Sequence, residues 1–385
     1  MLQMRDLPLA RQRLLIREDL NVPLSNGKIS DNTRLKAVVD TIAFAHKSGA
    51  TVMIMSHLGR PKEGSVEPLL SLKPIASALS ILLKMPVNFA EDWIEGFQAK
   101  AGSITLFENV RFLKGEQSND EELAKKMASL CDIFVNDAFA TAHRAHASTH
   151  GVAKYASIAC SGPLLTAEIT ALNKALENPK RPLVAVVGGA KVSTKLEIIQ
   201  SLLGKVDSLI VGGGIANTCL KASGQSIGAS LCENDMIETA EKIIKDLETN
   251  IPLPIDVVCG KKFEENEAGE RKKICEVTSD DMILDLGEES LQQIEKIILN
   301  AGTILWNGPL GVFEFPNFAQ GTKKLAEAIA KSKAFSIAGG GDTLSAISTF
   351  KVGDKISYIS TGGGAFLEFV EGKTLPAIAM LESRS

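Results

Sequence analysis

The chain has 385 residues and a formal net charge of −4, and its length predicts two or three domains. Hydrophobic residues make up 45% and charged residues 23%, both near the globular average, which excludes a disordered chain. The charge balance offers no basic field for nucleic acid, and no apolar run reaches the ~18 residues of a membrane span. We expect no signal peptide. Six cysteines without a CxxC pair predict reduced thiols, and we therefore expect a cytoplasmic protein with neither a nucleic-acid nor a membrane partner.

Short β-branched, apolar runs alternate with helical patterns along the chain, which is typical of β-α-β units and a parallel sheet. The predicted strands are 13–17, 51–55, 86–89, 104–107, 133–136, 183–187, 208–211, 255–258, 303–307, 335–338 and 356–360. Predicted helices include 34–47, 121–130 and 235–248, with Asn32, Asp120 and Asn234 as candidate N-caps. Segment 151–182 holds one helical run between proline-containing stretches. The pattern therefore predicts an α/β protein of two doubly wound domains joined by a hinge helix.

Charge and glycine are distributed unevenly between the two predicted domains. Residues 1–165 hold 19 Lys and Arg against 17 Asp and Glu, a net charge of 19 − 17 = +2. The remainder holds 23 against 29, a net charge of 23 − 29 = −6. All five histidines and eight of the eleven arginines lie before residue 151, whereas the glycine clusters lie after residue 187. This asymmetry predicts two domains that bind different ligands.

Cationic and polar residues follow the strands of the first predicted domain. In open α/β sheets ligands bind beyond the carboxyl ends of the strands, so these residues are the informative ones. Arginine suits bidentate recognition of carboxylate and phosphate. Surface ion pairs would explain any single arginine, but four strand ends that repeat the pattern favour a site for a small, strongly anionic ligand. The positions concerned are Arg17, Asp19, Asn21, Arg34, His57, Arg60, Arg111 and Arg144.

Glycine follows the strands of the second predicted domain. A single cluster would be read as a turn, but five clusters at strand ends indicate close backbone approach to a nucleotide polyphosphate. Lys191 and Lys195 are four residues apart, so we expect them to share a helix face that points at phosphates. Asp342 stands at a strand end among the glycines, where a carboxylate can hold Mg²⁺ directly or through water. The clusters lie at 188–189, 212–214, 308–311, 339–341 and 362–364.

Several generic motifs are absent, which narrows the class. The dinucleotide fingerprint GxGxxG and the nucleophile elbow GxSxG do not occur. Gly372-Lys373-Thr374 lacks the first glycine of a P-loop, so we interpret it as a turn. His143, His146 and His150 have possible metal-ligand spacing, but an arginine lies between them and no carboxylate ligand is paired with them, so a metal site is disfavoured. The residues therefore indicate a two-domain phosphotransferase that closes to exclude water.

Long ordered motifs resemble those of the phosphoglycerate kinase family along nearly the whole chain. They include REDLNVP (17–23), SHLGRP (56–61), GGAKVSTKLEII (188–199), GGGDT (339–343) and TGGGAFLE (361–368). The resemblance implies two Rossmann-like domains with six-stranded parallel sheets, residues 1–165 with the returning segment 371–385, and residues 166–370. It also implies glycolytic phosphoryl transfer from 1,3-bisphosphoglycerate to MgADP, giving 3-phosphoglycerate and ATP, by a monomer.

The resemblance also implies roles for individual residues. Phosphoglycerate would be bound by Asp19, Asn21, Arg34, His57, Leu58, Gly59, Arg60, Arg111 and Arg144. The nucleotide and its Mg²⁺ would be bound by Gly188, Lys191, Lys195, Gly212, Glu314, Gly340, Gly341, Asp342 and Thr343, with Glu314 at the ribose and Asp342 nearest the metal. Arg34, Lys195, Gly363 and Gly364 would act on the transferred group.

The reaction needs no general base, because both nucleophiles, a carboxylate and a β-phosphate, are already anions. We therefore expect in-line transfer by positioning and charge neutralisation, with His57 as a binder. Two rival classes stay open at this point. Another acyl-phosphate kinase would keep the glycine loops and accept a different carboxylate. A non-catalytic anion-binding protein would not need Lys191, Lys195 and Asp342.

Overall fold

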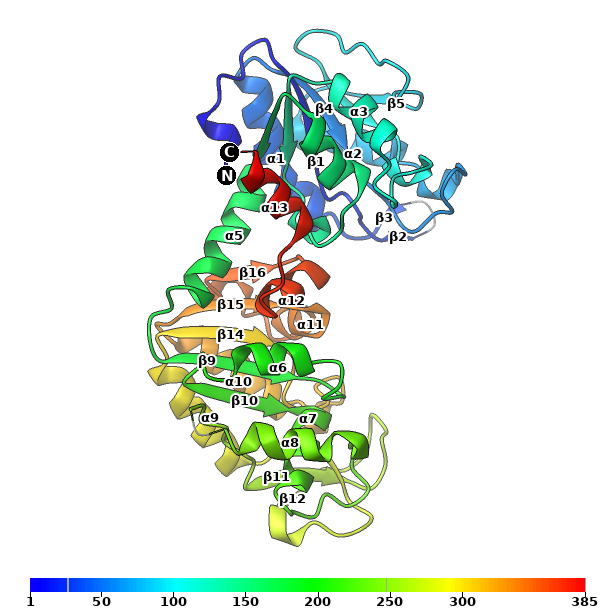
Figure 1. Ribbon diagram of the computed structural model, residues 1–385. Coiled ribbons are helices and arrows are strands. Elements are labelled where there is room, and N and C mark those ends of the chain that lie inside the picture. The colour runs from blue at the N-terminus through cyan, green and yellow to red at the C-terminus, as the bar shows by residue number, and fades with distance from the viewer. Residues whose placement is uncertain (26–27, 247, 385) are drawn as a thin grey trace. The chain divides into compact units, whose positions relative to one another are not determined.

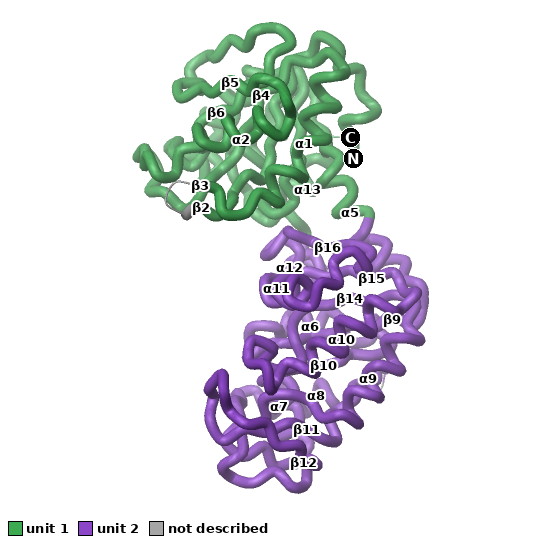
Figure 2. Tube along the Cα trace, turned by 180° about the vertical axis from the view of Figure 1, so that it is seen from behind, with its two compact units in different colours: residues 1–170, 374–385 green, residues 171–373 purple. Residues whose placement is uncertain are grey.

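The structure is a computed structural model that describes residues 1–25, 28–246 and 248–384. It divides into two compact units, one made of residues 1–170 with 374–385 and the other of residues 171–373 (Figure 2). The helix α5 (Pro163–Leu176) runs from the first unit into the second. None of the helices in the described residues is both long and apolar enough to cross a membrane.

Unit 1 is built on a six-stranded parallel sheet in the order β5-β6-β4-β1-β7-β8 (Figure 1). β4 is buried at every residue, as expected of a parallel strand that is covered on both faces. The sheet strands are β1 (Arg13–Arg17), β4 (Thr51–Met55), β5 (Val87–Ala90), β6 (Ile104–Phe107), β7 (Ile133–Asn136) and β8 (Ile158–Ser161). A short hairpin pairs β2 (Leu24–Ser25) with β3 (Lys28–Ile29).

Helices cover the unit 1 sheet, and they begin where short polar side chains can accept their first amides. The Asp120 carboxylate accepts from Leu123 N at 2.8 Å, which confirms the predicted cap of α3. At α1 the Asp31 carboxylate accepts from Thr33 N, so Asp31 takes the role expected of Asn32. α1 and α2 pack over one core with Leu14, Ile16 and Ile54. The helices are α1 (Thr33–Lys47), α2 (Lys73–Leu83), α3 (Glu121–Ser129), α4 (Val152–Tyr155) and α13 (Pro376–Ser383).

Unit 2 has a five-stranded parallel sheet in the order β10-β9-β14-β15-β16, not the six strands expected. The predicted strand at 255–258 is β11, which pairs antiparallel with β12 and β13 in a separate sheet. No helix is described between β11 and β12, and a parallel pairing would require such a crossover. The strands are β9 (Leu183–Gly188), β10 (Ser208–Gly212), β11 (Asp256–Gly260), β12 (Glu270–Lys273), β13 (Met282–Leu286), β14 (Thr303–Asn307), β15 (Phe335–Gly339) and β16 (Tyr358–Ser360).

The helices of unit 2 pack in neighbouring sets: α10 contacts both α9 and α11, α6 contacts α12, and α7 contacts α8 (Figure 1). The core beneath the first set contains Trp306, Ile304 and Leu325. The predicted helix 235–248 is shorter, because Asn234 lies in a 3₁₀ turn and its side chain accepts from Lys221. The helices are α6 (Leu196–Leu202), α7 (Gly213–Ala222), α8 (Ile237–Ile244), α9 (Glu288–Asn300), α10 (Gln320–Lys331), α11 (Gly341–Phe350) and α12 (Gly364–Val370).

Candidate active site

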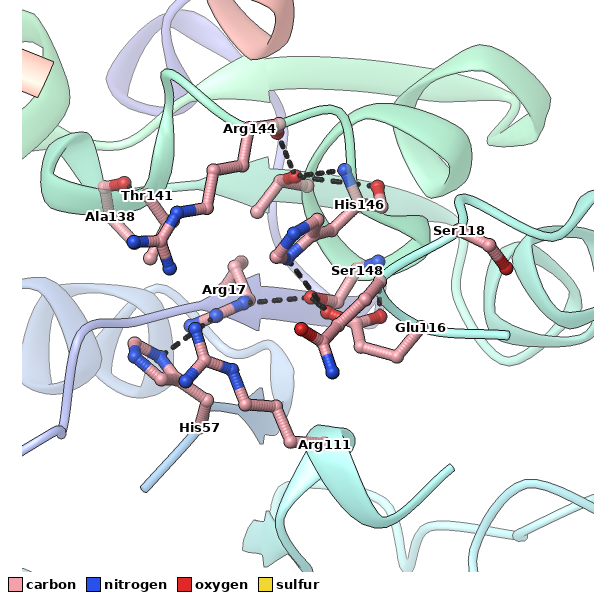
Figure 3. Close-up of polar contacts among 12 residues, drawn as sticks. Arg17, His57, Arg111, Glu116, Ser118, Ala138, Thr141, Arg144, His146 and Ser148 are labelled. Atoms are coloured by element: carbon pink, nitrogen blue, oxygen red, sulfur yellow. Dashed lines mark hydrogen bonds and ion pairs between the residues drawn. The ribbon is translucent and has the colours of Figure 1, made fainter. Parts of the chain in front are cut away.

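The carboxyl edge of the unit 1 sheet gathers the predicted cationic side chains. Arg17 ends β1, His57 follows β4, Arg111 follows β6 in the 3₁₀ turn Val110–Phe112, and Arg144 lies in the segment after β7. Figure 3 shows these four side chains approaching one another. Arg17, His57 and Arg111 are only 1%, 5% and 6% exposed. The structure thus brings together residues that lie as far as 127 positions apart (144 − 17) in the chain.

Positive charge is concentrated in this cluster. Burial, reinforced by the charges of Arg144 and Arg17, lowers the pKa of Arg111 to about 10. Burial and then Arg17 and Arg111 hold the pKa of His57 well below its usual range, so the imidazole is neutral at pH 7. Like charges packed beside each other repel and cost free energy, and an anionic ligand would relieve that cost.

Arg34 lies at the start of α1 and is tied to the loop that follows β1. One of its terminal nitrogens, Nη1, is 3.0 Å from a carboxylate oxygen of Asp19 and donates to the backbone oxygen of Asn21 at 2.7 Å. The Asn21 side chain in turn accepts from Gly59 N at 2.9 Å. These contacts join the loops after β1 and β4, and the partly exposed guanidinium of Arg34 keeps surface for a ligand.

The predicted residues Leu58, Gly59 and Arg60 form the loop after β4. The Leu58 side chain is buried, so any contact with a ligand must come from its backbone. Asn109 exchanges hydrogen bonds with the Leu58 backbone, accepting at 3.3 Å and donating at 2.8 Å. Arg111 donates to the Gly59 carbonyl. Arg60 is exposed, and its charge also lowers the pKa of Arg111.

The lysines of unit 2 are arranged differently from the expectation. α6 begins at Leu196, so Lys195 lies in the turn before the helix and Lys191 before that turn, and the two do not share a helix face. Lys195 is half-buried and donates to the Asn307 side chain at 2.5 Å, whereas Lys191 is exposed. Burial lowers the pKa of Lys195, and the charge of Asp342 opposes that shift. Of the two lysines, Lys195 is therefore the oriented one.

The strand-end glycines of unit 2 serve two different purposes. A Cβ at Gly188 would lie 1.8 Å from the Pro309 carbonyl oxygen, and one at Gly212 would lie 2.6 Å from the same atom. Glycine is required at these two positions because neighbouring loops pack backbone against backbone. At Gly341 and Gly363 an added Cβ would meet nothing within 4 Å. Only the second group leaves backbone surface open for a ligand.

Of the described helices of unit 2, α7, α11 and α12 begin at glycines, and the last two are each preceded by a glycine with positive φ. Gly340, with φ +99°, precedes α11, and Gly363, with φ +52°, precedes α12 beginning at Gly364. Neither helix has a side-chain cap among the described residues, so N–H groups at these termini are available to an anion. Asp342 is exposed in the first turn of α11, and the buried Thr343 hydroxyl accepts from Gly308 N at 2.8 Å.

A cavity of about 330 Å³ opens in unit 2 beside the glycines that begin α7 and the loop that holds Leu310 and Val312. Its lining is mainly apolar, with glycine backbone of α7 on one side and the chain around β13 on another. Asp285 lies at its wall, and burial raises the pKa of that carboxyl to about 7. The lining includes Gly213, Gly214, Leu231, Leu284, Leu310 and Val312. An apolar slot of this size suits a flat heteroaromatic ring.

Sequence reasoning did not assign several residues that shape the two sites. Asn307 orients Lys195 and also donates to the Gly339 carbonyl at 2.7 Å, and its place at the end of β14 was the available signal. Glu116 and Ser148 are buried beneath the cationic cluster. The apolar cavity is lined by segments that lie far apart in the chain, so no local sequence pattern predicts it.

Comparison with known proteins places these features in one family. The family model described as phosphoglycerate kinase matches residues 4–373. The chain belongs to the phosphoglycerate kinase family. It is 54% identical to the solved phosphoglycerate kinase from Coxiella burnetii, with a TM-score of 0.97 over 100% of this chain and 99% of that one. With the phosphoglycerate kinase from Pyrococcus horikoshii OT3 the identity is 32% and the TM-score 0.81, over 100% and 99%.

Membership of the phosphoglycerate kinase family confirms the predicted α/β fold class and activity. The chain is an enzyme of glycolysis that transfers a phosphoryl group between a phosphoglycerate and an adenine nucleotide. Its substrates are 1,3-bisphosphoglycerate or 3-phosphoglycerate, and ADP or ATP. The two rival classes raised from the sequence are thereby excluded.

Proposed function

We propose that unit 1 binds the phosphoglycerate and unit 2 binds the nucleotide. The observation that carries the first assignment is the buried cationic cluster at the carboxyl edge of the unit 1 sheet. Several guanidiniums and a neutral imidazole match a small ligand with a phosphate and a carboxylate. The proposed contacts are Asp19, Asn21, Arg34, His57, Leu58, Gly59, Arg60, Arg111 and Arg144.

The nucleotide would lie along the loops of unit 2. Its base would enter the apolar cavity, and its ribose would meet the exposed Glu314. The phosphates would face Lys195 and the open N-terminus of α11, with the exposed Lys191 nearby. We propose that the nucleotide site is formed by Gly188, Lys191, Lys195, Gly212, Glu314, Gly340, Gly341, Asp342 and Thr343. Gly188 and Gly212 would contribute indirectly, by letting neighbouring loops pack closely.

The residues of unit 2 fit Mg²⁺ if the nucleotide phosphates supply most of its ligands. Among the described residues no group of three or more His, Cys, Asp or Glu side chains could hold a metal ion. A site that combines one carboxylate with substrate phosphates suits Mg²⁺, and the exposed carboxylate of Asp342 beside the α11 terminus supplies that ligand. When bound with the nucleotide, the ion would neutralise phosphate charge.

The residues of the chain would act by position and charge. Arg34 and Lys195 would stabilise the negative charge on the transferred phosphoryl group, and the Gly363–Gly364 terminus of α12 would offer it backbone N–H donors. Direct in-line transfer requires the two ligands to meet with water excluded, so we propose that the units close about α5. We further propose that the enzyme is a cytoplasmic monomer.

A coupled assay tests these assignments. With 3-phosphoglycerate and MgATP, Lys195→Ala should lower kcat by about 10²–10³-fold, because it removes an oriented cation from the transition state. Lys191→Ala is the matched control, and we expect only a few-fold rise in the KM for MgATP, since Lys191 is exposed. Equal effects from the two variants would contradict the separate roles. A panel of other carboxylates should give negligible turnover.

A further inference from the structure

A chain of buried polar groups lies behind His57 in unit 1 (Figure 3). The Glu116 carboxylate accepts from Ser148 twice, from the backbone N at 2.9 Å and from Oγ at 2.5 Å. Arg17 Nε donates to Ser148 Oγ at 3.0 Å, and Arg17 Nη2 lies 3.2 Å from His57 Nδ1. None of these four side chains is more than 5% exposed. The contacts therefore form one continuous chain shielded from solvent.

The direction of each hydrogen bond in this chain follows from its chemistry. The serine hydrogen points to the carboxylate, which leaves the lone pairs of Ser148 Oγ to accept from Arg17. A guanidinium has donors only, so its contact with His57 requires a lone pair on Nδ1. In a neutral imidazole the proton is then on Nε2. The distance between Arg17 and His57 thus carries information about the tautomer of the ring.

We propose that Glu116, Ser148 and Arg17 are positioning residues that hold His57 as the neutral Nε2–H tautomer, so that the ring donates a hydrogen bond to an anionic oxygen of the phosphoglycerate. The inference rests on the proposed function, which assigns His57 to that ligand. It adds two residues, Glu116 and Ser148, that need not touch the ligand.

The charges around His57 support a neutral ring. Arg17, Arg111, Arg144 and Arg34 all face it, and with burial they lower its pKa well below the usual value. A second ring proton on Nδ1 would point at the guanidinium of Arg17 and break the contact. The imidazole therefore keeps one donor across the physiological pH range.

Glu116 supplies negative charge beneath this cluster. Burial raises the pKa of its carboxyl, but the two hydrogen bonds from Ser148 and the charges of Arg17 and Arg111 favour the ionised form. An ionised Glu116 orients Ser148, and an oriented Ser148 fixes the plane of the Arg17 guanidinium. Removal of the hydroxyl should therefore be felt at His57 although Ser148 makes no direct contact with it.

The first test is the wild-type enzyme itself. The ¹⁵N signals of the His57 imidazole should show a bare Nδ1 and a protonated Nε2 with no titration in the usual histidine range, and 3-phosphoglycerate should shift the Nε2 signal. A ring protonated on Nδ1 would overturn the proposal. If the ring has the expected tautomer but its Nε2 signal does not shift on addition of 3-phosphoglycerate, the proposal is also overturned, because His57 then does not contact the substrate. The two failures are therefore distinguishable.

The second test removes the Ser148 hydroxyl from this series of hydrogen bonds. In Ser148→Ala the ring should titrate closer to its usual range, and the KM for 3-phosphoglycerate should rise about tenfold, corresponding to about 1.4 kcal/mol, with a smaller change in kcat. The ratio of this KM to the wild-type KM should change between pH 5.5 and 8, and this ratio cancels the ionisation of the substrate. The KM for MgATP should be unchanged.

Ser161→Ala is the matched control for lost stability. Ser161 is a fully buried serine of unit 1 whose hydroxyl bonds to the Leu2 carbonyl at 3.1 Å, outside the chain of contacts. It should leave the tautomer and the KM ratio unchanged. Glu116→Gln should act in the same direction as Ser148→Ala if the latter folds poorly. If the KM ratio does not change with pH in either Ser148→Ala or Glu116→Gln, the proposal is overturned.

Discussion

The two units present different chemical means of holding an anion. Unit 1 places charged side chains at the ends of its strands and buries several of them, including Arg17 and Arg111. Unit 2 places glycine at its strand ends, where α11 and α12 begin without a side-chain cap among the described residues, and Lys195 is oriented there by a hydrogen bond to Asn307. Under the proposed assignment, unit 1 would recognise its ligand by side-chain charge and unit 2 mainly by backbone.

The free-energy cost of building each site has a different physical origin. In unit 1 the cost is electrostatic, because guanidiniums are packed together and a bound anion would relieve their repulsion. In unit 2 the cost is conformational and steric, since loops must approach as closely as Gly188 and Pro309 do. The same substitution, or the same change of solvent, should therefore act unequally on the two units.

Loss of one proposed catalytic guanidinium should have the largest effect. We expect Arg34→Ala to lower kcat by about 10³-fold, because no other cation replaces its charge on the transferred group. The KM for MgATP should change by less than about threefold, since the nucleotide is assigned to unit 2. Steady-state kinetics with both substrates varied measures this. A kcat near the wild-type value would show that the role assigned to Arg34 is wrong.

The two kinds of glycine in unit 2 can be separated by alanine. Gly188→Ala places a methyl group against the Pro309 carbonyl and should lower the free energy of unfolding by about 3 kcal/mol or more. Gly341→Ala meets no neighbour, so its unfolding free energy should change by less than about 1 kcal/mol while the KM for MgADP rises several-fold. Urea denaturation followed by Trp306 fluorescence in a Trp93→Phe background reports unit 2. Equal loss of stability would remove the distinction.

Acid should weaken unit 1 through its neutral histidines. Burial and then Arg111 and Arg144 lower the pKa of His146 to about 4, so between about pH 6.5 and 4 the unfolded chain binds a proton that the folded chain does not. Stability falls as pH falls through this window. Between pH 7.5 and 5 we expect His146→Gln to lose about 1–2 kcal/mol less than the wild type. Urea denaturation with Trp93 as the probe, in a Trp306→Phe background, measures the difference, and parallel pH profiles would contradict it.

Salt should have the smallest effect and should separate the two sites. Raising ionic strength from about 0.05 to 0.2 M screens the exposed parts of the cationic cluster, such as Arg60, and should raise the KM for 3-phosphoglycerate a few-fold. Inhibition by adenosine, which carries no phosphate, should be insensitive to the same change because its base would occupy an apolar cavity. A salt-sensitive inhibition constant for adenosine would place charge in that cavity.

The strands of both sheets were largely predictable from the sequence because buried parallel strands are short, continuous apolar runs. β1, β4, β6, β7 and β14 begin and end at the predicted residues. β12, with the sequence Glu-Arg-Lys-Lys, has no apolar residue, and only its pairing with β11 makes it a strand. The helix face expected for Lys191 and Lys195 was wrong because the chain forms a turn there before α6.

The cationic strand ends of unit 1 were visible in the sequence because topology brings the carboxyl ends of parallel strands together. The support beneath them was not. Ser148 lies 131 residues from Arg17 and 32 from Glu116, so their hydrogen bonds arise only from tertiary packing. No local pattern marks a buried serine as part of such a network, and composition cannot distinguish it from a core serine.

The return of the chain to unit 1 affects the order in which the two units can finish folding during synthesis. α13 docks there through Ala377 N, which donates to the Ala142 carbonyl at 3.1 Å, and Arg384 donates to the Ala156 carbonyl at 2.8 Å. A ribosome makes most of unit 1 first but its last helix only after the whole of unit 2, residues 171–373, has been synthesised. The unit translated second is one uninterrupted segment, so it can complete its contacts first. The half of the enzyme that is begun earliest is therefore finished last.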